Sequence, residues 1–338
     1  MTGRYRWRWR PGVGSRPSIG GARVALAMAI ALAGTMVGPI HHVTAQTAPA
    51  FTLSHYVQNG LSNAAFSSSG CTQGRATGGY VLVVLDFGQP WVSGASYGAR
   101  YWYYGGVSFL STASIASYVE SYAQGFYACG AASTNLRLAV GTNNDSPYVS
   151  AAHGAQWSAM VGSINSWLAS RGYSGRITAA GAIDAEPGFS ASASMTRSWM
   201  AGFGSTWIAY NFGSADGCSW TTYSAPPGQP CNRGWRQDDL YYLAWAAPAA
   251  WALPEVYATG LLTLPNGARS NLMANQWEMV RLYGSRYGSK GAVVLAGSMA
   301  QTDGLAPATS WTYLYNSVNA YSPQQGAVAW STKIVWGL

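Results

Sequence analysis

From Tyr80 to the C-terminus, short apolar runs alternate with longer segments in which apolar residues recur at helical spacing. The run 80–85 is continuously apolar, which is typical of a strand buried on both faces. Segments 115–126 and 157–168 carry apolar side chains three and four residues apart, which indicates amphipathic helices. The other predicted strands are 136–140, 177–183, 207–210, 240–245, 292–296 and 327–330, and the other predicted helices lie near 199–203, 272–283 and 308–319.

Strands that alternate with helices in this way predict a parallel sheet. About seven or eight such units favour an α/β fold of the (β/α)8-like TIM-barrel type over an open doubly wound sheet, which stays the alternative. The stretch 212–239 shows no clear helix, so we expect the barrel to be irregular there. We expect a single barrel domain over 75–338, with residues 46–74 as an N-terminal segment packed onto it. Because 49% of the residues are hydrophobic, the chain can bury a large core.

Residues 1–45 are typical of a signal peptide. They contain six arginines and no acidic residue, and an apolar run from Val24 to Ile40 precedes small residues near Ala45. The absence of an adjacent Arg-Arg pair favours a Sec-type signal, and a retained membrane anchor is the alternative. No later run reaches the roughly 18 apolar residues of a spanning helix. We therefore expect a secreted or cell-surface protein with no stable membrane span after cleavage.

The net charge of +8 belongs mostly to this leader. Without its six arginines the remainder carries 13 basic and 11 acidic residues, a net charge of +2. A nucleic-acid partner therefore loses its main support.

Four cysteines follow the leader, and an even count in an exported chain predicts two disulfides. Nearest-neighbour pairing gives Cys71–Cys129 and Cys218–Cys231. The second pair would close a loop rich in turn residues. A zinc site built from all four cysteines is disfavoured because no C-x2-C spacing occurs.

Polar and aromatic residues gather where the predicted strands end, which is the active-site face of a parallel barrel. Asp184 and Glu186 give the sharpest signal, because residues i and i+2 of a strand point to the same side. Two close carboxyls resist double ionisation, so one can keep the proton that a general acid needs while the other stabilises positive charge. Calcium binding or helix capping is the alternative role of this pair. Asp86 directly follows an apolar strand, where a carboxyl is costly to bury unless it is partnered or functional.

Several side chains around these acids are candidates for binding a sugar. Flat aromatic faces with polar edges suit sugar rings, although the same aromatics can simply cover the end of a barrel. The candidate substrate-binding residues are Asn143, Asn211, Trp91, Trp102, Tyr210, Trp245 and Gln301.

Other chemistries have less support. Ser96 lies in a G-x-S-x-G match, but ten residues beyond Asp86 rather than at a strand-to-helix turn. After the leader only His55 and His153 remain, without an H-E-x-x-H motif. No phosphate-binding glycine motif follows a strand. We therefore expect no cofactor and no metal.

Asp86 at the end of the first predicted strand, with Gln89 after it, and Asp184-x-Glu186 at the end of a later one resemble the barrel lysozymes of glycoside hydrolase family 25. They also resemble the related glycoside-hydrolase-like domains of bacterial surface proteins. The D-x-E is similar, in addition, to the end of the strand motif of the family 18 chitinases. These resemblances imply polymers that contain N-acetylhexosamine, with Glu186 as the acid and Asp184 and Asp86 as electrostatic or acetamido-orienting partners.

The chain departs from these families at several points. Ala179 and Ala182 stand where the chitinase motif has aspartates, and only Asp303 offers a late acidic strand end. The long first loop and the insertion between Cys218 and Cys231 differ from the family 25 lysozymes. The sequence thus predicts an exported hydrolase of cell-wall glycan, peptidoglycan or chitin-like, and the rival hypothesis is a non-catalytic carbohydrate-binding or cell-surface protein.

Overall fold

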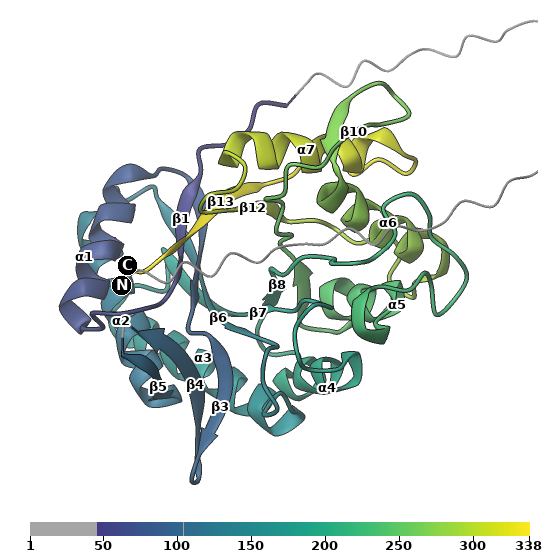
Figure 1. Cartoon of the computed structure of the whole chain (residues 1–338). Coiled ribbons are helices and arrows are strands. Elements are labelled where there is room, and N and C mark those ends of the chain that lie inside the picture. Colours follow the sequence, from purple (N-terminus) through teal and green to yellow (C-terminus); the bar gives the residue numbers. More distant parts are fainter. Residues whose placement is uncertain (1–45, 104) are drawn as a thin grey trace, which may run out of the picture. The chain divides into compact units, whose positions relative to one another are not determined.

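An eight-stranded parallel sheet organises the protein, in a computed structural model that describes residues 46–103 and 105–338 (Figure 1). The strand order is β12-β13-β1-β2-β6-β7-β8-β9, and every pairing in it is parallel. The strands are β1 (Thr52–Tyr56), β2 (Tyr80–Asp86), β6 (Asn135–Asn143), β7 (Ile177–Asp184), β8 (Ala209–Asn211), β9 (Ala250–Ala252), β12 (Gly297–Gln301) and β13 (Trp330–Trp336). The predicted signal peptide, residues 1–45, lies outside the described residues.

The sheet curls, but its ladder is not continuous around a full circle. Between the edge strands β9 and β12, the described residues form two isolated parallel bridges, Ala252–Leu295 and Glu255–Met299. The structure therefore shows a mixed α/β fold with a curled parallel sheet, without a regularly closed barrel.

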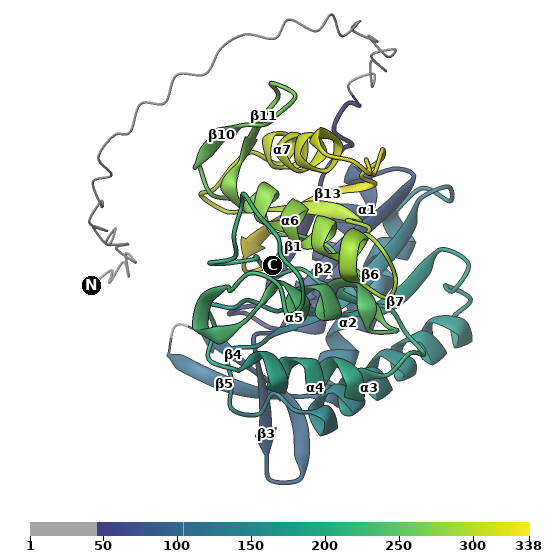
Figure 2. The same ribbon diagram turned by 90° about the vertical axis from the view of Figure 1, so that its right-hand side faces the viewer.

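Helices cover the outer side of this sheet, and Figure 2 shows several of them in front of it. Serine or asparagine side chains accept a backbone N–H at the start of five of them, which stabilises these N-termini. The helices are α1 (Asn63–Ala76), α2 (Thr112–Cys129), α3 (Ala151–Ser170), α4 (Ala193–Phe203), α5 (Gln237–Tyr241), α6 (Leu272–Tyr287) and α7 (Pro307–Ala320).

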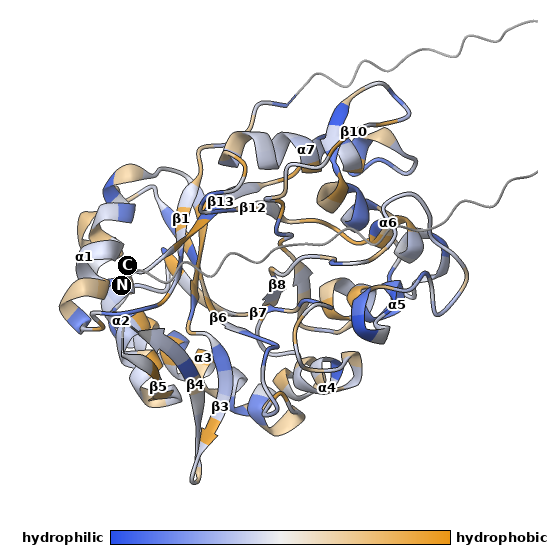
Figure 3. Ribbon diagram, viewed as in Figure 1, coloured by the Kyte–Doolittle hydropathy of each residue, from blue (hydrophilic) through white to orange (hydrophobic). Residues whose placement is uncertain are grey.

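The strands are buried on both faces, as the continuous apolar runs predicted. Along β2, Leu82 and Val84 belong to an inner core, whereas Val83 and Leu85 belong to the core between the sheet and its helices. Figure 3 shows the apolar strands surrounded by more polar helices and loops. Asp86 follows in the same alternation as Leu82 and Val84, so its side chain points to the inner side of the sheet.

The long first loop is in fact a small antiparallel sheet. It consists of β3 (Gln89–Ser93), β4 (Ser96–Tyr103) and β5 (Gly106–Ser111) and projects from the end of β2 (Figure 1). A second hairpin is formed by β10 (Leu261–Thr263) and β11 (Arg269–Asn271). Ser96 lies at the first hairpin's turn, which explains why its G-x-S-x-G match forms no nucleophile elbow.

The residues predicted to pack onto the barrel supply part of it. β1 lies inside the sheet, between β13 and β2, and α1 follows it. The predicted boundary at residue 75 thus differs from the structure, in which the first strand of the sheet begins at Thr52.

Three predicted strands are also corrected. Residues 240–245 are helical, in α5 and the π-helical turn Tyr242–Ala246 that follows it. The runs 292–296 and 327–330 largely precede the actual strands β12 and β13.

Both predicted disulfides are confirmed: Cys71–Cys129 and Cys218–Cys231. They fit an extracellular protein. No helix within residues 46–103 and 105–338 combines the length and apolar character needed to cross a membrane.

Candidate active site

Four acidic side chains meet at the carboxyl ends of the parallel strands. Asp86 ends β2, Asp184 ends β7, and Glu186 and Glu255 follow β7 and β9. The Asp184 carboxyl interacts electrostatically with the other three. We call Asp86, Asp184, Glu186 and Glu255 the carboxyl cluster. The sequence predicted three of its members at one end of the sheet, and the structure brings them together there.

Glu255 is the member that the sequence analysis missed. Its side chain is 1% exposed and accepts two hydrogen bonds, from Tyr56 Oη at 2.7 Å and from Gln301 Nε2 at 3.0 Å. Gln301 Nε2 also lies 3.2 Å from Tyr56 Oη, so the two donors support each other. Burial and the charges of Glu186 and Asp86 raise the pKa of Glu255 well above its ordinary value, although both hydrogen bonds oppose that shift. Asp303, the expected late acid, lies instead in an exposed turn.

Asp86 and Asp184 are buried acids whose hydrogen bonding is incomplete. Their side chains are 2% and 3% exposed, and Oδ1 of each has no hydrogen-bond partner among the described residues. Burial raises the pKa of Asp86 to about 8, against the opposing effect of the Gly88 amide. Burial and the neighbouring charges of Glu186, Glu255 and Asp86 raise the pKa of Asp184. A protonated carboxyl relieves the cost of burying these unpaired charges.

Glu186 is the most accessible of the four, because its side chain is only half-buried whereas the other three are fully buried. Its Oε1 accepts the Ser214 amide at 3.0 Å. Asn144 fixes its backbone on both sides, since Oδ1 accepts the Glu186 N–H and Nδ2 donates to the Glu186 carbonyl. Burial raises the pKa of Glu186, and the charge of Asp216 adds to that effect. The cluster thus has one partly exposed carboxyl, Glu186, and three that are buried.

No cation neutralises the carboxyl cluster within the described chain, where the ion pairs join Arg197 to Asp238 and Asp239, and Arg281 to Glu278. Oxygens of Asp184, Glu186 and Glu255 lie within 4.8 Å of one another, so these three residues could also hold a hard metal ion. The same spacing suits acid chemistry, because carboxyls this close favour a shared or retained proton.

Of the predicted amides, only Gln301 contacts the cluster. Asn143 ends β6 beside Asp184, but its Oδ1 accepts the Asp145 amide. Asn211 Oδ1 accepts the Gly213 amide. Its neighbour Tyr210 belongs to the inner core of the sheet, so the Asn211 side chain points to the opposite face, toward the helices.

Two of the predicted aromatic residues lie at the other end of the sheet. Tyr210 contacts Trp330, which begins β13 and donates to the carbonyl of Tyr80 at the start of β2. Trp245 donates to the carbonyl of Lys290 in the segment that leads into β12. Trp245 differs from its predicted place because residues 240–245 are helical and form no strand of the sheet.

Other aromatic side chains do lie on the active-site side. Trp91 in β3 packs under the guanidinium of Arg100 at 4.5 Å and against Tyr148 edge-on. Trp102 in β4 is 57% exposed. Trp336 ends β13, is 60% exposed, and stacks at 4.5 Å on Tyr56, the residue that donates to Glu255. Trp336 was missed because the strand 330–336 was predicted to end at Trp330.

The two histidines serve the structure. His153 is buried, with Trp199 Nε1 donating to Nδ1 and Nε2 lying 2.8 Å from the Gly98 carbonyl. His55 Nδ1 lies 2.6 Å from the carbonyl of Gly337. None of these partners belongs to the carboxyl cluster.

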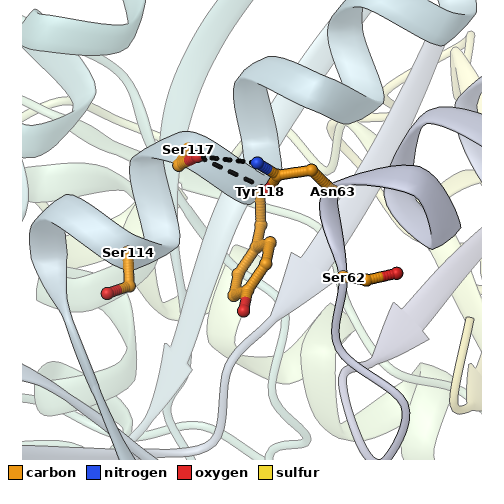
Figure 4. A pocket seen from close by; sticks show the side chains of 5 residues that line it. All are labelled: Ser62, Asn63, Ser114, Ser117 and Tyr118. Atoms are coloured by element: carbon orange, nitrogen blue, oxygen red, sulfur yellow. Dashed lines mark hydrogen bonds between the residues drawn. The ribbon is translucent and has the colours of Figure 1, made fainter.

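A surface hollow between the starts of α1 and α2 lies outside the sheet (Figure 4). Asn63 and Ser117 hydrogen-bond across it, and none of its lining residues belongs to the carboxyl cluster. Its lining residues are Ser62, Asn63, Ser114, Ser117 and Tyr118.

No protein-family model matches the chain, and no curated protein matches it.

Proposed function

We propose that the protein is an exported glycoside hydrolase that cleaves N-acetylhexosamine-containing cell-wall glycan, peptidoglycan or a chitin-like polymer. The scaffold would be a (β/α)8-like barrel, similar to that of the family 25 lysozymes. One observation carries the proposal: a half-buried glutamate, Glu186, stands among three buried carboxyls at the carboxyl ends of parallel strands. In parallel barrels the active site lies at this end of the strands.

Glu186 would act as the general acid. Burial raises its pKa, which favours the protonated form needed to donate to a glycosidic oxygen. As the glycosidic bond breaks, positive charge develops on the anomeric carbon of the sugar that stays in the site. Asp184 and Asp86 would stabilise that charge or orient the acetamido group. Glu255, held by Tyr56 and Gln301, adds a fourth carboxyl whose position is fixed before the substrate binds.

The spacing within the cluster favours retention of anomeric configuration. Oxygens of Asp184, Glu186 and Glu255 lie within 4.8 Å of one another. Retaining pairs lie about 5–5.5 Å apart, whereas inverting pairs need roughly 6.5–9.5 Å to admit a water molecule. Neighbours whose nearest oxygens lie this close to Glu186 fit the retaining spacing better than the inverting one.

The exposed aromatics support a sugar ligand and also favour the rival function. Trp336 and Trp102 each expose more than half of their surface, at 60% and 57%. A flat indole face packs well against the apolar face of a sugar ring. Because binding needs only these surfaces, a non-catalytic carbohydrate-binding or cell-surface protein on the same fold is the second candidate.

Release of reducing ends from purified peptidoglycan and from chitin separates the two functions. We expect release by the wild type, with products of retained configuration, and a loss of at least about 100-fold in Glu186→Gln, since a general acid contributes roughly 10²–10⁴-fold. Glu120→Gln is the matched control, because Glu120 lies in α2 outside the cluster and should keep wild-type activity. Binding without release by both wild type and Glu186→Gln would establish the non-catalytic function instead.

A further inference from the structure

The loop that carries Glu186 is held by a second segment, residues 213–218, which follows β8. The two run in close contact: a Cβ added to Gly213 would lie 2.7 Å from the Ala185 nitrogen, and Ser214 N donates to Glu186 Oε1. Further along, a Cβ added to Gly188 would lie 2.9 Å from Asp216 Oδ2. The Asp216 carboxylate therefore lies against the backbone of the Glu186 loop.

Asp216 is itself fixed from the other side of the disulfide. Asn232 Nδ2 donates to Asp216 Oδ2 at 2.5 Å, and Asn232 N donates to the Asp216 carbonyl. The Cys218–Cys231 disulfide joins the segments that carry Asp216 and Asn232, next to this contact. Gly217 adopts φ +69°, and its Cα packs so closely on Asn232 that a Cβ would overlap it. The carboxylate thus has little freedom to turn away.

Arg233 completes the connection. Its Nη1 donates to the carbonyl of Phe189 at 2.6 Å, so the disulfide-bonded segment also holds the far end of the Glu186 loop. Arg233 adopts φ +50°, in the left-handed region. Because this conformation is unfavourable for a non-glycine residue, the surrounding contacts must impose it.

We propose that Asp216, fixed by Asn232, is a positioning residue that holds the Glu186 loop in place and sets a negative charge near the Glu186 carboxyl. The inference rests on the proposed role of Glu186 as the acid. It assigns a task to a carboxylate outside the carboxyl cluster.

The charges around Glu186 support this role. Acidic groups face it from three sides: Asp184 in β7, Glu255 after β9 and Asp216 after β8. The phenol of Tyr257 also faces these carboxyls, and their charges add to burial in raising the pKa of Tyr257. Arg233, the nearby cation, is engaged by backbone carbonyls. Asp216 therefore adds like charge near Glu186, which favours the protonated form.

Asp216→Asn tests the proposal, because the amide keeps the size of the side chain and an oxygen for Asn232 while removing the charge. We expect the basic limb of the kcat/KM profile to move to lower pH by about one unit, so that the rate on that limb falls roughly tenfold, with little change in KM. Asn232→Ala should move the limb in the same direction by less. Asp145→Asn is the matched control: this carboxylate also contacts the Glu186 loop, because it accepts from Ser190 N and from Gln89 Nε2, but its charge does not act on the Glu186 carboxyl, so the limb should stay in place.

A direct titration of Glu186 separates this inference from the proposed function. The chain has four glutamates, so carbon-13 labelling of glutamate carboxyls gives four signals, and Glu186→Gln identifies the relevant one. We expect its midpoint to fall in Asp216→Asn and to stay unchanged in Asp145→Asn. An unchanged midpoint in Asp216→Asn overturns the inference. A lowered midpoint in a protein that releases no reducing ends would refute the hydrolase and leave the control of Glu186 by Asp216 standing.

Discussion

Asp86 is the residue whose charge state links the site to the stability of the whole protein. Its pKa of about 8 when folded lies well above the ordinary 3.8, because the carboxyl is buried. Between these two values the folded protein holds a proton that the unfolded chain has released. The free energy of unfolding therefore falls as the pH rises from about 4 to about 8.

Asp86→Asn should remove this dependence, because the amide stays neutral throughout. We expect little change in unfolding free energy at pH 4 and a gain on the order of a few kcal/mol at pH 8, since each pKa unit corresponds to about 1.4 kcal/mol. Urea denaturation at pH 4 and at pH 8 measures the unfolding free energy of both proteins. Asp303→Asn, in an exposed turn, serves as the control and should change neither value. Parallel pH profiles for Asp86→Asn and the wild type would contradict the protonated state of Asp86.

At the same scale, the sequence predicted those residues of the carboxyl cluster that lie at or just after the end of a clear apolar strand. Asp86, Asp184 and Glu186 were found this way. Glu255 was not, because β9 has only three residues and Pro254 separates it from the glutamate, so no strand pattern marks the position. Tyr56 was missed because its strand lies in the segment that was placed outside the barrel.

At the scale of elements, glycines set how closely the helices pack. A Cβ added to Gly125 in α2 would lie 1.9 Å from the Ser67 carbonyl oxygen in α1, and one added to Gly70 would lie 2.0 Å from the Tyr122 carbonyl oxygen. The α1–α2 pair can reach this separation only with hydrogen atoms at both positions. The Cys71–Cys129 disulfide joins the two helices beside this contact.

Gly125→Ala should push α1 and α2 apart and lower the unfolding free energy by about 3 kcal/mol, the upper end of typical overpacking costs. Gly162→Ala in α3 is the matched control: its added Cβ would meet Trp207 Nε1 at 3.3 Å, which a small shift relieves. Thermal unfolding followed by circular dichroism measures the stability of both variants. A Gly125→Ala protein as stable as Gly162→Ala would show that the helices do not pack so closely in solution.

Elements with strong periodicity were predicted well, and those without it were not. α2, α3, β2, β6 and β7 lie where their patterns placed them. The sequence predicts a strand at residues 240–245 because this helical segment is apolar on several sides, and a short apolar run does not distinguish a buried strand from a buried helix. β12 was displaced because its sequence, Gly-Ser-Met-Ala-Gln, is small and weakly apolar.

At the scale of the whole molecule, the first and last strands of the described chain, β1 and β13, pair with each other inside the sheet. β1 pairs with β13 over five residues and with β2 at its other edge. Side chains reinforce this pairing, because Ser54 Oγ lies 2.8 Å from Thr332 Oγ1 and accepts the Val84 amide. The first strand is thus needed to join the last strand to the rest of the sheet.

Deletion of residues 46–57 should therefore abolish cooperative folding, since it leaves the facing edges of β13 and β2 unpaired in the interior, and buried backbone groups without partners are costly. Deletion of residues 46–50 alone is the control and should melt like the full chain, because β1 begins only at Thr52. Differential scanning calorimetry distinguishes the two. A cooperative transition at the full-length temperature in the longer deletion would mean that this segment only packs onto a sheet that is complete without it, as the amino-acid sequence suggested.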